Sequence, residues 1–94
     1  MRGLLMANVL LVVRVYPETP EVDLSGILEN IRAGLPHGVR LKDHKVEEMG
    51  FGLQSLLLGL TMPDSEGVSE SVERSLQSVP GVSEVNVERV TRIL

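Results

Sequence analysis

Glycine and proline divide this chain into six segments, and the spacing of the apolar residues changes character from one segment to the next. These residues are the strongest local signals for the ends of helices and strands. The divisions fall at Pro17–Pro20, residues 34–38, Gly50–Gly52, Pro63-Asp64, Gly67 and Pro80-Gly81. Because each segment has the length of an ordinary helix or strand, the order of the elements can be predicted directly.

Four segments have the period of two that is typical of β-strands. They cover residues 8–16, 39–48, 53–62 and 82–92. The first and third are the most apolar, as expected of strands in the centre of a sheet. In the second strand, Val46 has the wrong parity to share a face with Leu41, so we expect a bulge or bend near Asp43 to Lys45. The parity changes again at Val90.

Two segments, residues 23–33 and 68–79, have the spacing of amphipathic helices. The first has apolar residues at positions i, i+3, i+4 and i+7 from Leu24, with Asp23 as its expected N-cap and Gly34 at its end. The second has an apolar stripe that begins at Val68. The full order is therefore strand, helix, strand, strand, helix, strand.

This order predicts an α+β, ferredoxin-like β-α-β-β-α-β sandwich, with a four-stranded antiparallel sheet and both helices on one face. The strand order would be 4-1-3-2, with the two most apolar strands in the centre. A chain of 94 residues has the size of one domain. We expect residues 7–94 to form it and residues 1–6 to be an N-terminal extension. The expected core consists of Val9, Leu11, Val13, Ile27, Ile31, Leu56, Leu58, Val72, Leu76, Val85 and Val87.

Composition excludes several classes of function. Nine Lys and Arg against thirteen Asp and Glu give a net charge of −4, which argues against direct binding to the nucleic-acid backbone. The chain has no Cys, so thiolate catalysis and sulfur-ligated metal sites are excluded. His37 and His44 have no third ligand fixed near them, so we expect no metal site. The apolar run over residues 4–13 is too short for a membrane span, and we expect a cytoplasmic protein.

Two local features allow more than one interpretation. Arg40, Lys42, His44 and Lys45 either protect an edge strand from pairing or face an acidic partner. Gly50-Phe51-Gly52 is either a hairpin turn with Phe51 in the core or a tight turn that exposes an aromatic anchor. The neighbouring acidic pair, Glu47-Glu48, points to opposite faces of a strand and is expected to be a solvated edge. The sequence contains no recognisable catalytic or phosphate-binding motif.

The sequence resembles the archaeal elongation factor 1-beta proteins and the C-terminal exchange domain of their eukaryotic counterpart. The resemblance covers residues 7–94. The stretches that carry it are VLLVVRVYP at 9–17, MGFGLQSL at 49–56, GVSEVNV at 81–87 and VTRI at 90–93. The glycine-flanked Phe and the terminal basic-Ile pair are its most specific parts.

The resemblance implies a guanine nucleotide exchange factor for the GTPase elongation factor 1-alpha, with no covalent chemistry, catalytic residue, cofactor or metal of its own. It implies that Phe51 contacts the GTPase and that Arg92, on the same side, reaches toward its Mg²⁺ site. The eukaryotic relatives have Lys at the position of Arg92. The implied partner-binding residues are Gly50, Phe51, Gly52, Thr91, Arg92 and Ile93. Neither a nucleic acid nor a membrane is an expected partner.

A small regulatory, ligand-binding module of the same fold is the alternative. Such a module would dimerise through its sheet edges and bind a metabolite between protomers. It has no need for the terminal Arg92-Ile93 pair, which is the feature that separates the two hypotheses. A metal-chaperone domain of this fold would need the Cys pair that the chain lacks.

Overall fold

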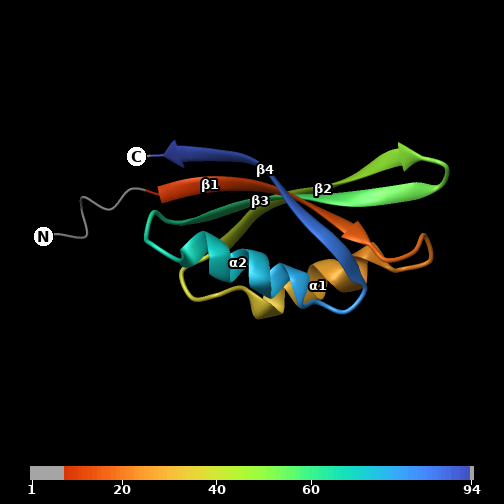
Figure 1. Cartoon of the computed structure of the whole chain (residues 1–94), viewed down its shortest axis with the longest axis horizontal. Helices are drawn as coiled ribbons and strands as arrows, with labels where there is room; N and C mark the ends of the chain where they lie inside the picture. The colour runs from red at the N-terminus through yellow and green to blue at the C-terminus, as the bar shows by residue number, and fades with distance from the viewer. Residues whose placement is uncertain (1–7, 94) are drawn as a thin grey trace, which may run out of the picture.

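Two helices cover one face of a four-stranded antiparallel sheet in the computed structural model, which describes residues 8–93 (Figure 1). The sheet order β2-β3-β1-β4 is the predicted 4-1-3-2 order, so the expected fold is confirmed. The N-terminal extension expected at residues 1–6 lies outside the described residues. The elements are β1 (Asn8–Pro17), α1 (Leu24–Gly34), β2 (Arg40–Gly50), β3 (Leu53–Pro63), α2 (Val68–Gln77) and β4 (Val82–Ile93).

The core lies between the helices and the inner face of the two central strands. Its fully buried side chains come from β1, β3 and both helices, and the largest are Leu11, Ile31, Leu56, Leu58, Leu60 and Leu76. Val85 and Val87 are only partly buried, which corrects the prediction that they belong to the core. They lie on β4, which is an edge strand. An edge strand has a neighbour on one side only, so its inward side chains are less completely covered.

The first helix begins as the sequence predicts. The Asp23 carboxylate accepts a hydrogen bond from the backbone N–H of Ser25 at 3.0 Å, which satisfies one of the free donors at the helix start. The Ser75 hydroxyl of α2 donates to the Gly34 carbonyl at 2.8 Å. This bond joins the end of α1 to α2 and helps to hold the two helices together on the sheet.

The bulge expected over residues 43–45 lies one residue earlier, at Lys42. Leu41 pairs with Leu60 and Asp43 with Gly59, so Lys42 is the extra residue. The Asp43 carboxylate occupies the space that a side chain on Gly59 would fill. A larger residue opposite Asp43 would therefore clash with it.

A second bulge, in β4, explains the parity change at Val90. Val12 pairs with Arg89 and Val13 with Val87, which leaves Glu88 as the extra residue. A bulge moves the following side chains to the other face of the strand. Glu88 itself lies on the face that the helices do not cover, where its carboxylate contacts Arg14.

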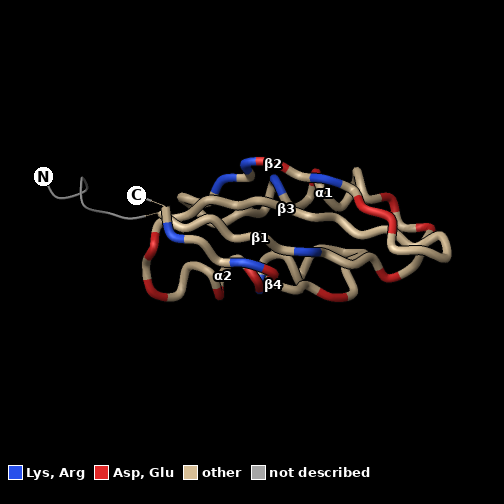
Figure 2. The backbone as a smooth tube through the Cα atoms, turned by 90° about the horizontal axis from the view of Figure 1, so that it is seen from above, with Lys and Arg blue, Asp and Glu red and all other residues tan. Residues whose placement is uncertain are grey.

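On that uncovered face, Arg14 of β1 joins all four strands. Its guanidinium lies 2.8 Å from the Glu47 carboxylate of β2 and 2.7 Å from the Glu88 carboxylate of β4. It also donates a hydrogen bond of 2.7 Å to the Ser55 hydroxyl of β3. These hydrogen bonds, to Glu88 first and then to Glu47, raise the pKa of Arg14 above its ordinary value. Both signs of charge are interspersed along this side of the molecule (Figure 2).

Glu47 lies on the edge strand β2, as expected, but its carboxylate is paired and not simply solvated. Its side chain is one-third exposed and is held by Arg14 and by Lys45, whose ammonium lies 3.1 Å away. Hydrogen bonds from Arg14 and then Lys45 hold the pKa of the Glu47 carboxyl below its ordinary value of 4.5. Glu48, on the next position, is exposed.

We expect Glu47→Gln to lower the melting temperature at pH 7 and to have a progressively smaller effect in acid. A carboxyl whose pKa is lowered by folding stabilises the folded state above its unfolded pKa. That contribution is lost as the pH falls below 4.5 and through the folded-state pKa. Thermal unfolding between pH 7 and pH 3 measures it. Glu48→Gln is the matched control, and an equal effect of both substitutions at pH 7 would contradict the role of Glu47.

Candidate functional site: two ends of the sheet

Phe51 lies at the tip of the β2–β3 hairpin and is completely exposed. Gly50 pairs with Leu53, so Phe51 and Gly52 are the two central residues of the turn. Both have positive φ, 57° and 76°, as a type I′ turn requires. Asn, Asp and Gly are the usual residues at such positions. Of the two interpretations of this turn, the exposed aromatic is the correct one.

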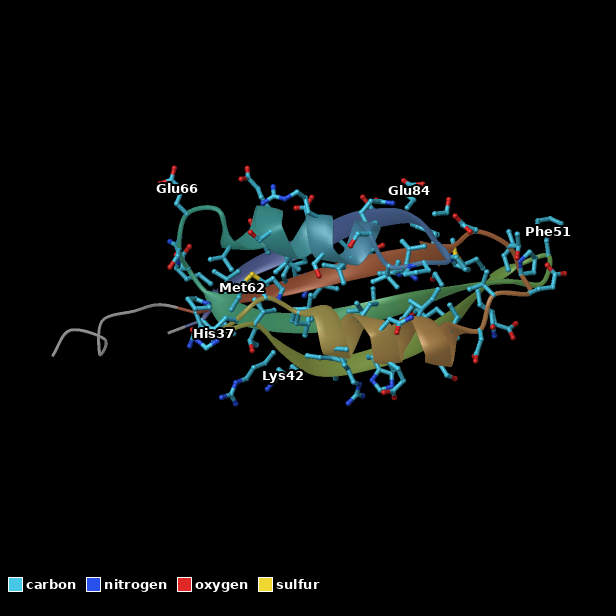
Figure 3. The ribbon with its side chains drawn as sticks, turned by 90° about the horizontal axis from the view of Figure 1, so that it is seen from below. His37, Lys42, Phe51, Met62, Glu66 and Glu84 are labelled. Atoms are coloured by element: carbon cyan, nitrogen blue, oxygen red, sulfur yellow. The ribbon has the colours of Figure 1, made fainter. Side chains whose placement is uncertain are left out.

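The hairpin extends beyond the end of the helices, so no helix covers its tip (Figure 1). Met49 and Leu53, which flank the turn, are also exposed. In Figure 3 the Phe51 side chain projects from the end of the molecule opposite the one that holds His37 and Met62. We call Met49, Phe51 and Leu53 the hairpin tip. An exposed apolar group with an aromatic centre is typical of an interface anchor.

Thr91, Arg92 and Ile93 form the end of β4 and remain within the sheet, where they pair with residues at the start of β1. The Arg92 side chain is 67% exposed, so its cation is accessible from solvent. One of its guanidinium nitrogens, Nη2, lies 2.7 Å from the Asp64 carboxylate. The Ile93 side chain is also exposed.

Phe51 does not lie beside the C-terminal segment, which corrects the expectation that the two act from the same side. Arg92 pairs with Val9, and Val9 pairs with Met62 near the end of β3. Phe51 precedes the start of that strand, at Leu53. With a rise of about 3.3 Å per residue, the length of β3 puts the two sites roughly 30 Å apart. They lie at opposite ends of a molecule that measures 51 Å in its longest dimension.

The basic residues of β2 lie along an edge of the sheet, and all of them are at least partly free of packing. Arg40, Lys42, His44 and Lys45 are exposed, and Lys45 pairs with Glu47 of its own strand. This arrangement suits protection of an edge strand. Within residues 8–93, no three His, Cys, Asp or Glu side chains gather as ligands for a metal ion.

The sequence did not predict the cluster of Arg14, Glu47 and Glu88 or the pairing of Arg92 with Asp64. Arg14 and Glu88 are 74 positions apart, and no local pattern joins them. Alternation along β4 places Glu88 on the same face as Asn86, which pairs with Arg14, so their shared face could be suspected. Asp64 could be placed near the end of β4 from the predicted topology, because β3 and β4 both flank β1.

The described residues thus form a small α+β domain that exposes an aromatic side chain at one end of its sheet and a cationic side chain at the other. Residues 10–93 match the family described as the EF-1 guanine nucleotide exchange domain. The chain belongs to this family, and the curated proteins that it is similar to include elongation factor 1-beta proteins. No helix in the described part of the chain is long and apolar enough to cross a membrane.

Relatives match over almost their whole length. Elongation factor 1-beta of Staphylothermus marinus is 43% identical, with 94% of this chain and 99% of that protein covered. The corresponding protein of Methanocella arvoryzae is 36% identical, and the match covers 93% of this chain and 98% of that protein. That of Halobacterium salinarum is also 36% identical, and the match covers 94% of this chain and 100% of that protein.

A solved structure supports the fold alone. The C-terminal domain of the MgtC protein from Mycobacterium tuberculosis superposes with a TM-score of 0.54 at 15% identity. The match covers 93% of this chain and 87% of that one. Such low identity carries no argument about function.

We expect Phe51→Asn to increase the free energy of unfolding by up to about 1 kcal/mol, because Asn adopts positive φ more readily than Phe. No packing is lost, since the ring is fully exposed. Urea unfolding of the two proteins measures the difference, with Phe51→Ala as the second variant. A loss of about 3–5 kcal/mol, as for a buried Phe, would show that the ring packs into the protein.

Proposed function

We propose that this chain promotes GDP release from elongation factor 1-alpha, and its reloading with GTP, during translation elongation. The observation that carries the proposal is the match to the exchange-domain family over residues 10–93. The two exposed sites support it, because an exchange factor needs contacts with its GTPase and no covalent chemistry. Stopped-flow release of labelled GDP from the cognate GTPase, with and without this protein, is the direct test.

Nucleotide exchange is a problem of binding energy. A nucleotide that binds with a nanomolar Kd has a binding free energy of about 12 kcal/mol. Mg²⁺ and the phosphate-binding loop of the GTPase supply much of it. A protein that binds the nucleotide-free GTPase better than the loaded form weakens nucleotide binding by the same factor, because the coupling is reciprocal. A cation placed near the Mg²⁺ site weakens metal coordination directly.

Within this proposal, Arg92 supplies the cation and Phe51 the anchor. Thr91 and Ile93 flank the cation, and Gly50 and Gly52 hold the turn that exposes the aromatic ring. Because the sites lie at opposite ends of the sheet, the protein contacts its GTPase at two places roughly 30 Å apart, given the strand rise. A rigid sheet fixes that spacing, so neither site needs to order a loop when it binds.

We expect Arg92→Ala to slow catalysed GDP release by roughly 10- to 100-fold, the range for losing a charge-assisted contact. The defect should shrink when a chelator removes Mg²⁺, because the proposed role of the cation is to disfavour the metal. Arg92→Lys should retain much of the activity. Stopped-flow traces at several Mg²⁺ concentrations make the comparison. A defect of equal size without Mg²⁺ would make Arg92 an ordinary binding contact.

Phe51→Ala should raise the concentration of exchange factor needed for half-maximal release by about tenfold and leave the maximal rate nearly unchanged, as expected for loss of an anchor. Sites this far apart without shared partners usually act independently. The effects of Phe51→Ala and Arg92→Ala on kcat/KM should therefore multiply in the double variant. Strong non-additivity would argue that the two ends do not make separate contacts.

A further inference from the structure

The Arg92 side chain is paired in the free protein with a carboxylate that lies two strands away. Arg92 is on β4 and Asp64 directly follows β3, with β1 between those strands. Their charged groups nevertheless approach to 2.7 Å. Since neighbouring strands are about 4.8 Å apart, the long Arg92 side chain must extend across the end of β1 to reach Asp64. It therefore lies along the protein and not away from it.

The position of Asp64 is set by the turn that joins β3 to α2. The N–H of Ser65 donates to the carbonyl of Pro63 at 2.9 Å, and the N–H of Val68 donates to the carbonyl of Ser65 at 3.3 Å. Pro63 is itself paired with Asn8 in the sheet. The carboxylate is thus presented by a hydrogen-bonded turn at a fixed place beside the end of β4.

An ion pair of this kind opposes the role assigned to Arg92. A guanidinium and a carboxylate in contact form a pair with no net charge. Such a pair repels a distant metal ion only weakly. We propose that Asp64 acts as a latch, a positioning residue that holds Arg92 against the sheet and that must release it before exchange. This inference rests on the function proposed for Arg92 and adds the step that makes its charge available.

The latch is weak enough to open. The two side chains are 67% and 35% exposed, so solvent screens their attraction. An ion pair this exposed changes the equilibrium between its paired and separated states by about 1.5- to 5-fold. Asp64 therefore modulates the rate of exchange and does not block it.

The variant that tests the latch is Asp64→Asn, which keeps the shape of the side chain and removes its charge. We expect kcat/KM for release of labelled GDP to rise by about 1.5- to 5-fold. Glu66→Gln is the matched control: it removes the same charge from the same turn, and Glu66 forms no ion pair in the described part of the chain. Its side chain points away from the body of the molecule in Figure 3. We expect no change in this control.

A double variant separates the latch from a general effect of charge. When Arg92→Ala is already present, Asp64→Asn should change nothing further, because the group that Asp64 holds is gone. A decrease in kcat/KM for Asp64→Asn would overturn the proposal, as would an equal increase for Glu66→Gln. So would an increase that persists in the Arg92→Ala background.

The free protein gives a second readout that needs no GTPase. NMR relaxation of the Arg92 Nε–H group should show greater mobility in Asp64→Asn than in the wild type or in Glu66→Gln. Unchanged mobility in all three would overturn the latch even if exchange is affected. If Arg92→Ala exchanges nucleotide at the wild-type rate, the function proposed for Arg92 fails, and the relaxation data still report whether the latch exists.

Discussion

The antiparallel pairing of β1 with β3 determines where every candidate functional residue lies. Eight successive residues of β1 pair with β3, and the buried side of this ladder contacts both helices. Because both strands are central, β2 and β4 can only add at the outer edges. The β2–β3 turn then lies at the end of β1, and the end of β4 lies at its beginning. The separation of Phe51 from Arg92 is a direct consequence.

The uncovered face of the sheet is held by polar contacts, since no helix packs there. Arg14 reaches side chains from the other three strands through short hydrogen bonds. Its side chain is only 15% exposed, so these contacts are better shielded from solvent than an ordinary surface pair. Removing Arg14 would leave the Glu88 carboxylate without the cation that it contacts, and the Glu47 carboxylate with Lys45 alone. This cluster therefore links all four strands on the face that the helices leave open.

Most of the fold could be predicted from the sequence because apolar periodicity and turn residues agree along the whole chain. The bulges were harder, since a parity change locates a bulge only to within a few residues. The detail that placed it at Lys42 is the lack of a side chain on Gly59, where the Asp43 carboxylate fits. That contact joins two strands, so it cannot be predicted from the sequence of either strand alone.

The site was predicted less well, for two different reasons. Whether Phe51 is buried depends on how far the hairpin extends past the helices, and spacing alone does not give that. The separation of Phe51 from Arg92, by contrast, already followed from the predicted topology. In that topology β3 leads away from Phe51 and ends at the same end of the sheet as β4, with β1 between them. The resemblance suggested one contact surface, and the direction of β3 shows that there are two ends.

If the proposed function holds, the two separated contacts also explain how an exchange factor can leave its GTPase. Two weak contacts joined by a rigid spacer bind much more tightly than either alone, because the second forms within the complex. The gain disappears when either contact is lost. Return of Mg²⁺ with GTP would remove the contact at Arg92, leaving the hairpin tip as a single weak contact. Asp64 would then recapture the released guanidinium, which lowers the free energy of the departing protein and favours its release.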